Sequence, residues 1–119
     1  MSLKSVPEIV AEARNGLRCL DPDTAKPMLA SESNPLIIDV REPGEVDQKK
    51  ARGTVNIPRG VLEMKITEHT TDPDQPIYVH CASGGRAALA AQALQNMGFN
   101  NVNVLNFDCD DVIASLGAA

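Results

Sequence analysis

An apolar strand that delivers one cysteine into a loop of small residues is the feature that most constrains this chain. Residues 77–79 are apolar, Cys81 follows two positions later, and an alanine-rich stretch begins at Ala87. In a strand, loop and helix of this order, the main-chain N–H groups point to the loop centre and favour negative charge there. Gly84 and Gly85 are predicted to let the loop curl tightly. Cys81 is therefore predicted to be a nucleophilic thiolate.

The length of this loop indicates which group the cysteine can carry. Four residues separate Cys81 from Arg86, whereas phosphatases that form a phosphocysteine have five residues between the cysteine and the arginine. A smaller ring of N–H groups fits one terminal sulfur better than a phosphoryl group with three oxygens. The predicted anion-binding loop consists of Ala82, Ser83, Gly84, Gly85 and Arg86.

The rest of the chain alternates between strand and helix patterns. A capping box at Ser5 and a stop at Gly16 predict a first helix, and Asp21 begins a second one that Pro27 should kink or shorten. A third helix is expected over residues 86–97, and short apolar runs predict strands at residues 17–20, 36–40, 55–57, 77–80 and 102–105. This order predicts an α/β fold with a mostly parallel five-stranded sheet and helices on both faces. The predicted division is an N-terminal helical segment, residues 1–16, and one domain, residues 17–119.

Several polar residues follow the predicted strands, at the sheet edge where α/β proteins place their sites. Arg41, Arg59 and Arg86 are predicted to converge on Cys81, where arginines suit an oxyanion. Arg41 and Arg59 are candidate substrate-binding residues, although Arg41 has the alternative of a surface ion pair with Glu42 or Glu45, and Arg86 of orienting the loop. Asp39 is expected to accept hydrogen bonds at a strand end, and His80 to point into the sheet. Cys109 follows the last strand and is a candidate resolving thiol, with an inert turn cysteine as the default.

Three motifs give the chain a resemblance to a known family. Residues 36–45 read LIIDVREPGE, residues 53–60 read GTVNIPRG, and residues 81–86 read CASGGR. In this order the motifs resemble those of the rhodanese (thiosulfate sulfurtransferase) family. The resemblance implies that Cys81 takes a sulfane sulfur from a donor such as thiosulfate, forms a persulfide, and passes the sulfur to a thiophilic acceptor. It implies no metal and no organic cofactor. Residues 108–111, Asp-Cys-Asp-Asp, stand where the family usually has a Gly-Gly turn.

Two other functions remain open at this point. One is a persulfide carrier that delivers sulfur to a protein partner, or takes it from one, with little turnover of free thiosulfate. The other is a phosphatase or arsenate reductase of related fold, which the short loop disfavours. Measuring sulfur uptake from thiosulfate separates these alternatives.

Composition limits the partners and the compartment. A net charge of −5 argues against nucleic-acid binding. Three cysteines without paired spacing predict free thiols in a cytoplasmic protein. No membrane span or signal peptide is predicted, because no apolar run approaches about 18 residues.

Overall fold

The computed structural model describes residues 2–119, and residue 1 of the predicted N-terminal segment lies outside them. Five strands form one sheet in the order β1-β5-β4-β2-β3, and every neighbouring pair is parallel. The strands are β1 (Arg18–Leu20), β2 (Leu36–Asp39), β3 (Thr54–Asn56), β4 (Ile77–His80) and β5 (Val102–Leu105). The predicted α/β fold is confirmed, and the predicted strands are confirmed to within one residue at either end.

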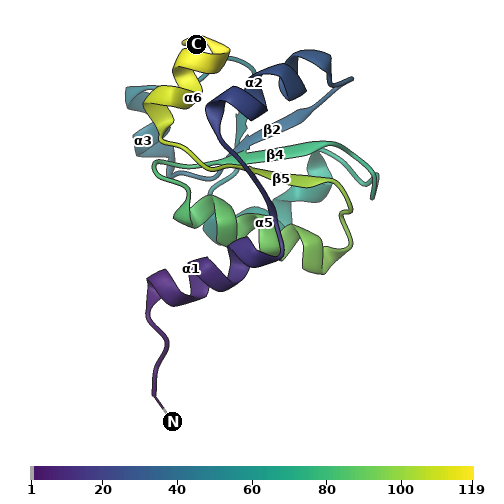
Figure 1. Ribbon diagram of the computed structural model, residues 1–119. Helices are drawn as coiled ribbons and strands as arrows, with labels where there is room; N and C mark the ends of the chain where they lie inside the picture. Colours follow the sequence, from purple (N-terminus) through teal and green to yellow (C-terminus); the bar gives the residue numbers. More distant parts are fainter. Residues whose placement is uncertain (1) are drawn as a thin grey trace.

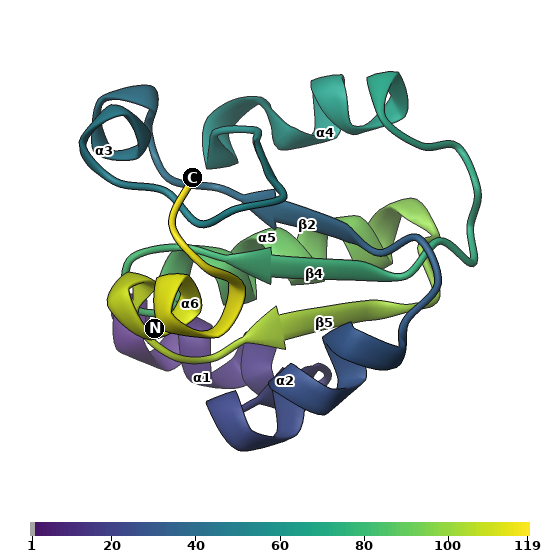
Figure 2. The ribbon, with the colours of Figure 1, turned by 90° about the horizontal axis from the view of Figure 1, so that it is seen from above.

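Helices cover both faces of this sheet (Figures 1 and 2). They are α1 (Val6–Asn15), α2 (Pro22–Ser31), α3 (Pro43–Gln48), α4 (Leu62–Lys65), α5 (Gly85–Met97) and α6 (Cys109–Leu116), with 3₁₀ turns η1 (Arg59–Val61) and η2 (Ile66–Glu68). Ser5 caps α1 and Gly16 ends it, as predicted. The predicted shortening of α2 at Pro27 is wrong, because the helix continues to Ser31. Pro27 is exposed, so water can bond the carbonyl that its missing N–H leaves free.

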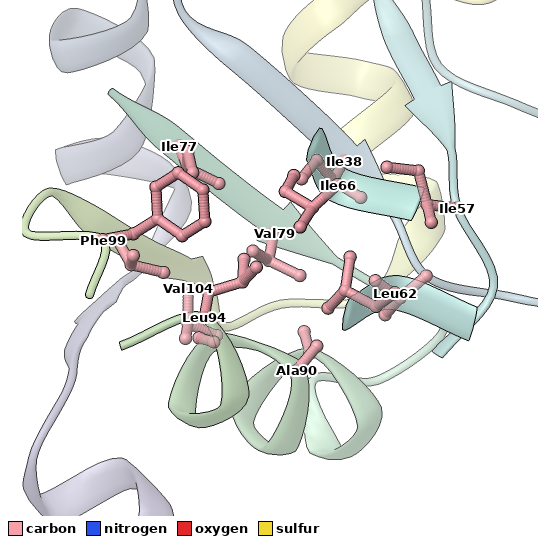
Figure 3. Close-up of a cluster of buried hydrophobic side chains, with 14 of the residues drawn as sticks. Ile38, Ile57, Leu62, Ile66, Ile77, Val79, Ala90, Leu94, Phe99 and Val104 are labelled. Atoms are coloured by element: carbon pink, nitrogen blue, oxygen red, sulfur yellow. The ribbon is translucent and has the colours of Figure 1, made fainter. Parts of the chain in front are cut away.

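Alternation along the strands builds two apolar layers. Ile38, Val79 and Val104 face α4 and α5, and they form the larger cluster with Leu62 and Leu94 (Figure 3). On the opposite face, Ile37, Tyr78 and Leu105 pack with residues of α2 and α6. A sheet with both faces buried explains why the strands read as continuous apolar runs.

The parallel strands point their carboxyl ends to one edge of the sheet. Figure 2 shows the arrowheads of β2, β4 and β5 directed to the edge where α3 and α6 lie. The segments that follow β2, β4 and β5 therefore meet at this edge, and they carry Arg41, Cys81 and Cys109. None of the helices within residues 2–119 is long and apolar enough to span a membrane.

Candidate active site

Cys81 lies at the base of the loop between β4 and α5. The N–H of Gly84 donates to Cys81 Sγ at 3.0 Å, and the N–H of Ala87 donates at 3.4 Å. Only 1% of the Cys81 surface is exposed. A sulfur that accepts two main-chain N–H groups at a helix start, away from bulk water, is in a setting that favours negative charge on it.

Gly84 gives the loop its shape. Its φ angle is +105°, in the left-handed region, and it caps the N-terminus of α5. A Cβ on Gly84 would lie 2.9 Å from Asn106 Oδ1 and 3.1 Å from Arg14 Nη2. Gly85, by contrast, is the first residue of α5 and has no positive φ. The curl predicted for both glycines is therefore made by Gly84 alone.

Arg86 joins the loop to α3 through Glu45. Its Nη1 and Nη2 atoms donate to the two Glu45 carboxylate oxygens at 2.7 and 2.9 Å. These bonds, followed by one from the N–H of Glu42, lower the pKa of Glu45 to about 2. Glu45 is therefore ionised at neutral pH and compensates the charge of Arg86. This contact fits the orienting role considered for Arg86.

Arg41 is buried in an ion pair with Asp39. Arg41 Nη2 lies 2.7 Å from Asp39 Oδ2, and the two side chains are 3% and 0% exposed. The guanidinium also donates to the main-chain oxygens of Glu45 and Lys49, which fixes the end of α3 to the end of β2. The hydrogen bonds that Arg41 donates to Asp39 raise the pKa of Arg41 above its ordinary value. The sequence offered Glu42 or Glu45 as the ion-pair partner of Arg41. The partner is instead Asp39, whose carboxylate is buried beside the guanidinium.

His80 completes this buried polar group. Its Nε2 lies 3.6 Å from Asp39 Oδ2, and its Nδ1 lies 3.4 Å from the main-chain oxygen of Cys81. Burial lowers the pKa of His80, and the charge of Asp39 opposes that shift only in part. The ring is thus neutral at pH 7, and both of these neighbours are oxygen atoms.

Breaking the buried pair is expected to destabilise the fold. Replacing Arg41 by methionine leaves the Asp39 carboxylate buried without its cation, which should lower the free energy of unfolding by about 3–5 kcal/mol. Urea unfolding at pH 7 measures this loss. The control is Arg59→Met, which removes the more exposed Arg59–Glu63 pair and should change stability by less than about 1 kcal/mol. Equal losses in the two variants would contradict a structural role for the Arg41–Asp39 pair.

Arg59 lies at the start of η1 and faces α5. Its Nη1 bonds Glu63 Oε1 at 2.9 Å, and it borders a hollow over α5 with Leu89 and Asn96. All three arginines expected around Cys81 are therefore paired with carboxylates: Arg41 with Asp39, Arg59 with Glu63, and Arg86 with Glu45. Each of these cations is compensated by a nearby carboxylate, and the predicted role of the three arginines in binding an oxyanion beside Cys81 stays a prediction.

Cys109 lies against the loop rather than in a free turn. It is the first residue of α6, and its N–H donates to the main-chain oxygen of Ala82 at 3.0 Å. Asp108 caps the same helix through the N–H of Asp111. Burial raises the pKa of the Cys109 thiol; Arg41 opposes this shift and Asp39 adds to it. A protonated thiol is a poor nucleophile, which argues against the resolving role of Cys109. This role stays a prediction, and peptide mapping for a Cys81–Cys109 crosslink after mild oxidation tests it.

A cleft of about 300 Å³ opens beside the loop. Its lining residues are Arg41, Glu45, Gln48, Lys49, Ala82, Asp108, Cys109 and Asp110. Lys49 Nζ bonds Asp110 Oδ1 at 2.6 Å, so an exposed ion pair links the end of α3 to the first turn of α6. Three carboxylates against two cations line this cleft, which makes it less attractive to a dianion than the sequence suggests.

The sequence interpretation did not find Arg14 or Asn106, whose side chains lie where a Cβ on Gly84 would meet them. Neither belongs to a motif, and Arg14 lies in a helix that was assigned to a separate N-terminal segment. Only the packing of α1 against α5 brings Arg14 to the loop.

The sequence matches the rhodanese-like domain family over residues 21–112. The chain belongs to this family. Its loop is thus a rhodanese loop, and the rhodanese match begins at the N-cap of α2, after α1 and β1.

Several similar proteins have names that refer to sulfur transfer. YrkF of Bacillus subtilis, named as a candidate sulfur carrier, is 33% identical over 98 residues, which are 82% of this chain and 46% of YrkF. Further curated relatives, 28% to 31% identical, are named as sulfurtransferases. This rhodanese chain spans only 46% to 62% of the length of the first three curated relatives.

Solved structures share the whole fold. The polysulfide-sulfur transferase homodimer of Wolinella succinogenes is 28% identical, with a TM-score of 0.76 over 92% of this chain and 83% of that one. A Rhodopseudomonas palustris protein of unknown function, described as a possible tyrosine phosphatase, is 26% identical, with a TM-score of 0.81 over 97% of this chain and 93% of that one.

Proposed function

We propose that this rhodanese is a sulfurtransferase that works through a persulfide on Cys81. The Cys81 thiolate attacks the outer sulfur of a donor such as thiosulfate, and sulfite leaves with the electron pair of the broken S–S bond. An acceptor thiolate, or cyanide, then attacks the terminal sulfur and returns Cys81 as a thiolate. This is covalent catalysis in two half-reactions. The observation that carries the proposal is the pair of N–H groups directed at Cys81 Sγ.

Sulfur uptake by the intact chain tests this proposal. Incubation with thiosulfate should add the mass of one sulfur atom, and peptide mapping should assign it to Cys81. Steady thiocyanate production on addition of cyanide would support the enzyme. If thiosulfate, a mercaptan donor and a cysteine desulfurase all leave the protein without added sulfur, sulfur transfer is excluded.

A persulfide carrier is the second candidate, and the likeness to YrkF favours it. A carrier would take up sulfur but turn over free thiosulfate slowly, delivering the sulfur to a protein acceptor instead. The net acidic cleft supports this alternative, because it repels small oxyanions without blocking a neutral thiol. Uptake from a mercaptan donor without thiocyanate production would select the carrier.

Phosphoryl transfer is the third reading, and loop length argues against it. Four residues lie between Cys81 and Arg86, and the two N–H groups at 3.0 and 3.4 Å converge on the sulfur itself. We expect no hydrolysis of an aryl phosphate by the unmodified protein. Measurable hydrolysis that depends on Cys81 would count against the size argument.

The Lys49–Asp110 pair is expected to control the preference for charged donors. In Asp110→Asn, one negative charge leaves the cleft and the cation of Lys49 loses its partner. Sulfur uptake from thiosulfate should then rise about two- to fivefold at low salt, while uptake from a neutral persulfide should change little. Stopped-flow or quenched mass measurements give both rates.

Glu68→Gln is the charge-matched control for this prediction. Glu68 is exposed in η2 and does not line the cleft, so its loss should not alter the ratio of the two rates. If Asp110→Asn leaves the ratio unchanged, or if both donors accelerate equally, the ion pair does not select donors by charge.

A further inference from the structure

The N-terminal helix α1 packs against α5, the helix that follows the Cys81 loop (residues 81–86). Val10 and Ala13 of α1 are buried against Ala88 of α5. Val10 Cγ2 lies 3.9 Å from the position of a Cβ on Gly85, the first residue of α5. Figure 1 shows α1 along the side of α5 that faces away from the sheet. This packing brings the last turn of α1 to the start of α5, where the loop ends.

Arg14 is the residue that α1 places there. Its Nη2 lies 3.1 Å from the position of a Cβ on Gly84. Its Nε is buried and has no hydrogen-bond partner. Within residues 2–119, Arg14 forms no salt bridge, whereas Arg41, Arg59 and Arg86 each have a carboxylate within bonding distance. Arg14 is thus a cation beside the loop without a carboxylate partner, and it lies outside the three sequence motifs.

Gly84 connects this cation to the reactive sulfur. The Arg14 guanidinium occupies the space beside Gly84 that a Cβ would approach, and the Gly84 N–H donates to Cys81 Sγ at 3.0 Å. A positive charge beside that N–H strengthens the donor and stabilises a negative sulfur beyond it. Because the Nε of Arg14 is buried, solvent screens the charge less than on an open surface.

We propose that Arg14 is a positioning residue of the persulfide site, which holds Gly84 and supplies positive charge from behind the loop. The proposal rests on the sulfur-transfer function of Cys81. It makes α1 part of the site, although α1 precedes the segment that matches the family. The competing explanation is purely structural, because a cation in the last turn of a helix also stabilises the helix dipole.

Alkylation of Cys81 distinguishes the two roles in the full chain. Arg14→Met keeps most of the side-chain stem and removes the charge, and Arg14→Lys keeps the charge. At pH 7 the alkylation of Cys81 by iodoacetamide, followed by peptide mapping, should slow about five- to tenfold in Arg14→Met. It should slow by no more than about twofold in Arg14→Lys. Lys26→Gln, an exposed charge change on α2, should alkylate at the rate of the unchanged protein.

Alkylation needs no sulfur donor, so this test is separate from that of the proposed function. Failure of every donor to load Cys81 would remove sulfur transfer while leaving an Arg14 effect on thiol reactivity visible. Unchanged alkylation in a folded Arg14→Met protein, with only a lower melting temperature, would assign Arg14 to helix stability and overturn the proposal. If Arg14→Met does not fold, Arg14→Gln is measured instead, and unchanged alkylation in that variant overturns it equally.

Discussion

Replacing Cys81 by serine is expected to abolish sulfur uptake. The two N–H groups that bond Cys81 Sγ would remain, but a serine hydroxyl is not ionised at neutral pH and is a far weaker nucleophile. Loss of the nucleophile in covalent catalysis lowers the rate by about 10³-fold or more. Intact mass after incubation with thiosulfate should show no added sulfur, and thiocyanate production should fall to the background rate.

Cys19→Ser is the matched control for this loss. Cys19 is half-buried in β1, and it does not line the cleft. Burial raises the pKa of its thiol, so it should carry no sulfur at neutral pH. Retention of the full mass increase by Cys81→Ser would mean that another thiol is loaded and that Cys81 is not the carrier of the sulfur.

The second large effect is expected for Gly84→Ala. An alanine at this position must adopt a φ of +105° and place its Cβ 2.9 Å from Asn106 Oδ1 and 3.1 Å from Arg14 Nη2. The left-handed φ strains an alanine at this position, and a change of the backbone that relieves this strain moves the Gly84 N–H away from Cys81 Sγ. Loss of an N–H donor aimed at developing charge lowers rates by about 10²- to 10³-fold, and sulfur uptake measured by mass should slow accordingly.

Gly98→Ala separates loop displacement from simple backbone strain. Gly98 ends the same helix with a φ of +111°, and no atom lies within 4 Å of its Cβ position. It should lose stability through the left-handed φ, roughly 1–2 kcal/mol, yet keep sulfur uptake near the normal rate. Similar slowing in both variants would show that strain anywhere along α5 is sufficient and that the contact at Gly84 is unimportant.

A double variant tests the origin of the Gly84 effect. Replacing Asn106 by glycine removes the Oδ1 atom that the new Cβ would meet at 2.9 Å. Gly84→Ala combined with Asn106→Gly should therefore regain part of the uptake rate lost in Gly84→Ala alone. No recovery would indicate that Arg14, or the left-handed φ itself, dominates the loss.

The sequence alone determined the family, the fold class and the place of the cysteine loop. Mostly apolar runs identified β4 and β5 over their full lengths, because strands buried on both faces read that way. The order of strand, cysteine, small loop and helix located the ring of N–H groups around Cys81. These features are local, so a short stretch of sequence carries them.

Only the tertiary structure decided which charges surround the loop. Glu45 lies 41 positions from Arg86 yet neutralises it, and Asp39 buries the charge of Arg41. Arg14, which no motif marked, lies against Gly84 because α1 packs on α5. Ion pairs depend on distances between side chains from separate elements, and the spacing of residues along the chain does not encode those distances. The sequence therefore located Cys81 in its loop, and the packing of α1, α3 and α6 around that loop decided its electrostatic environment.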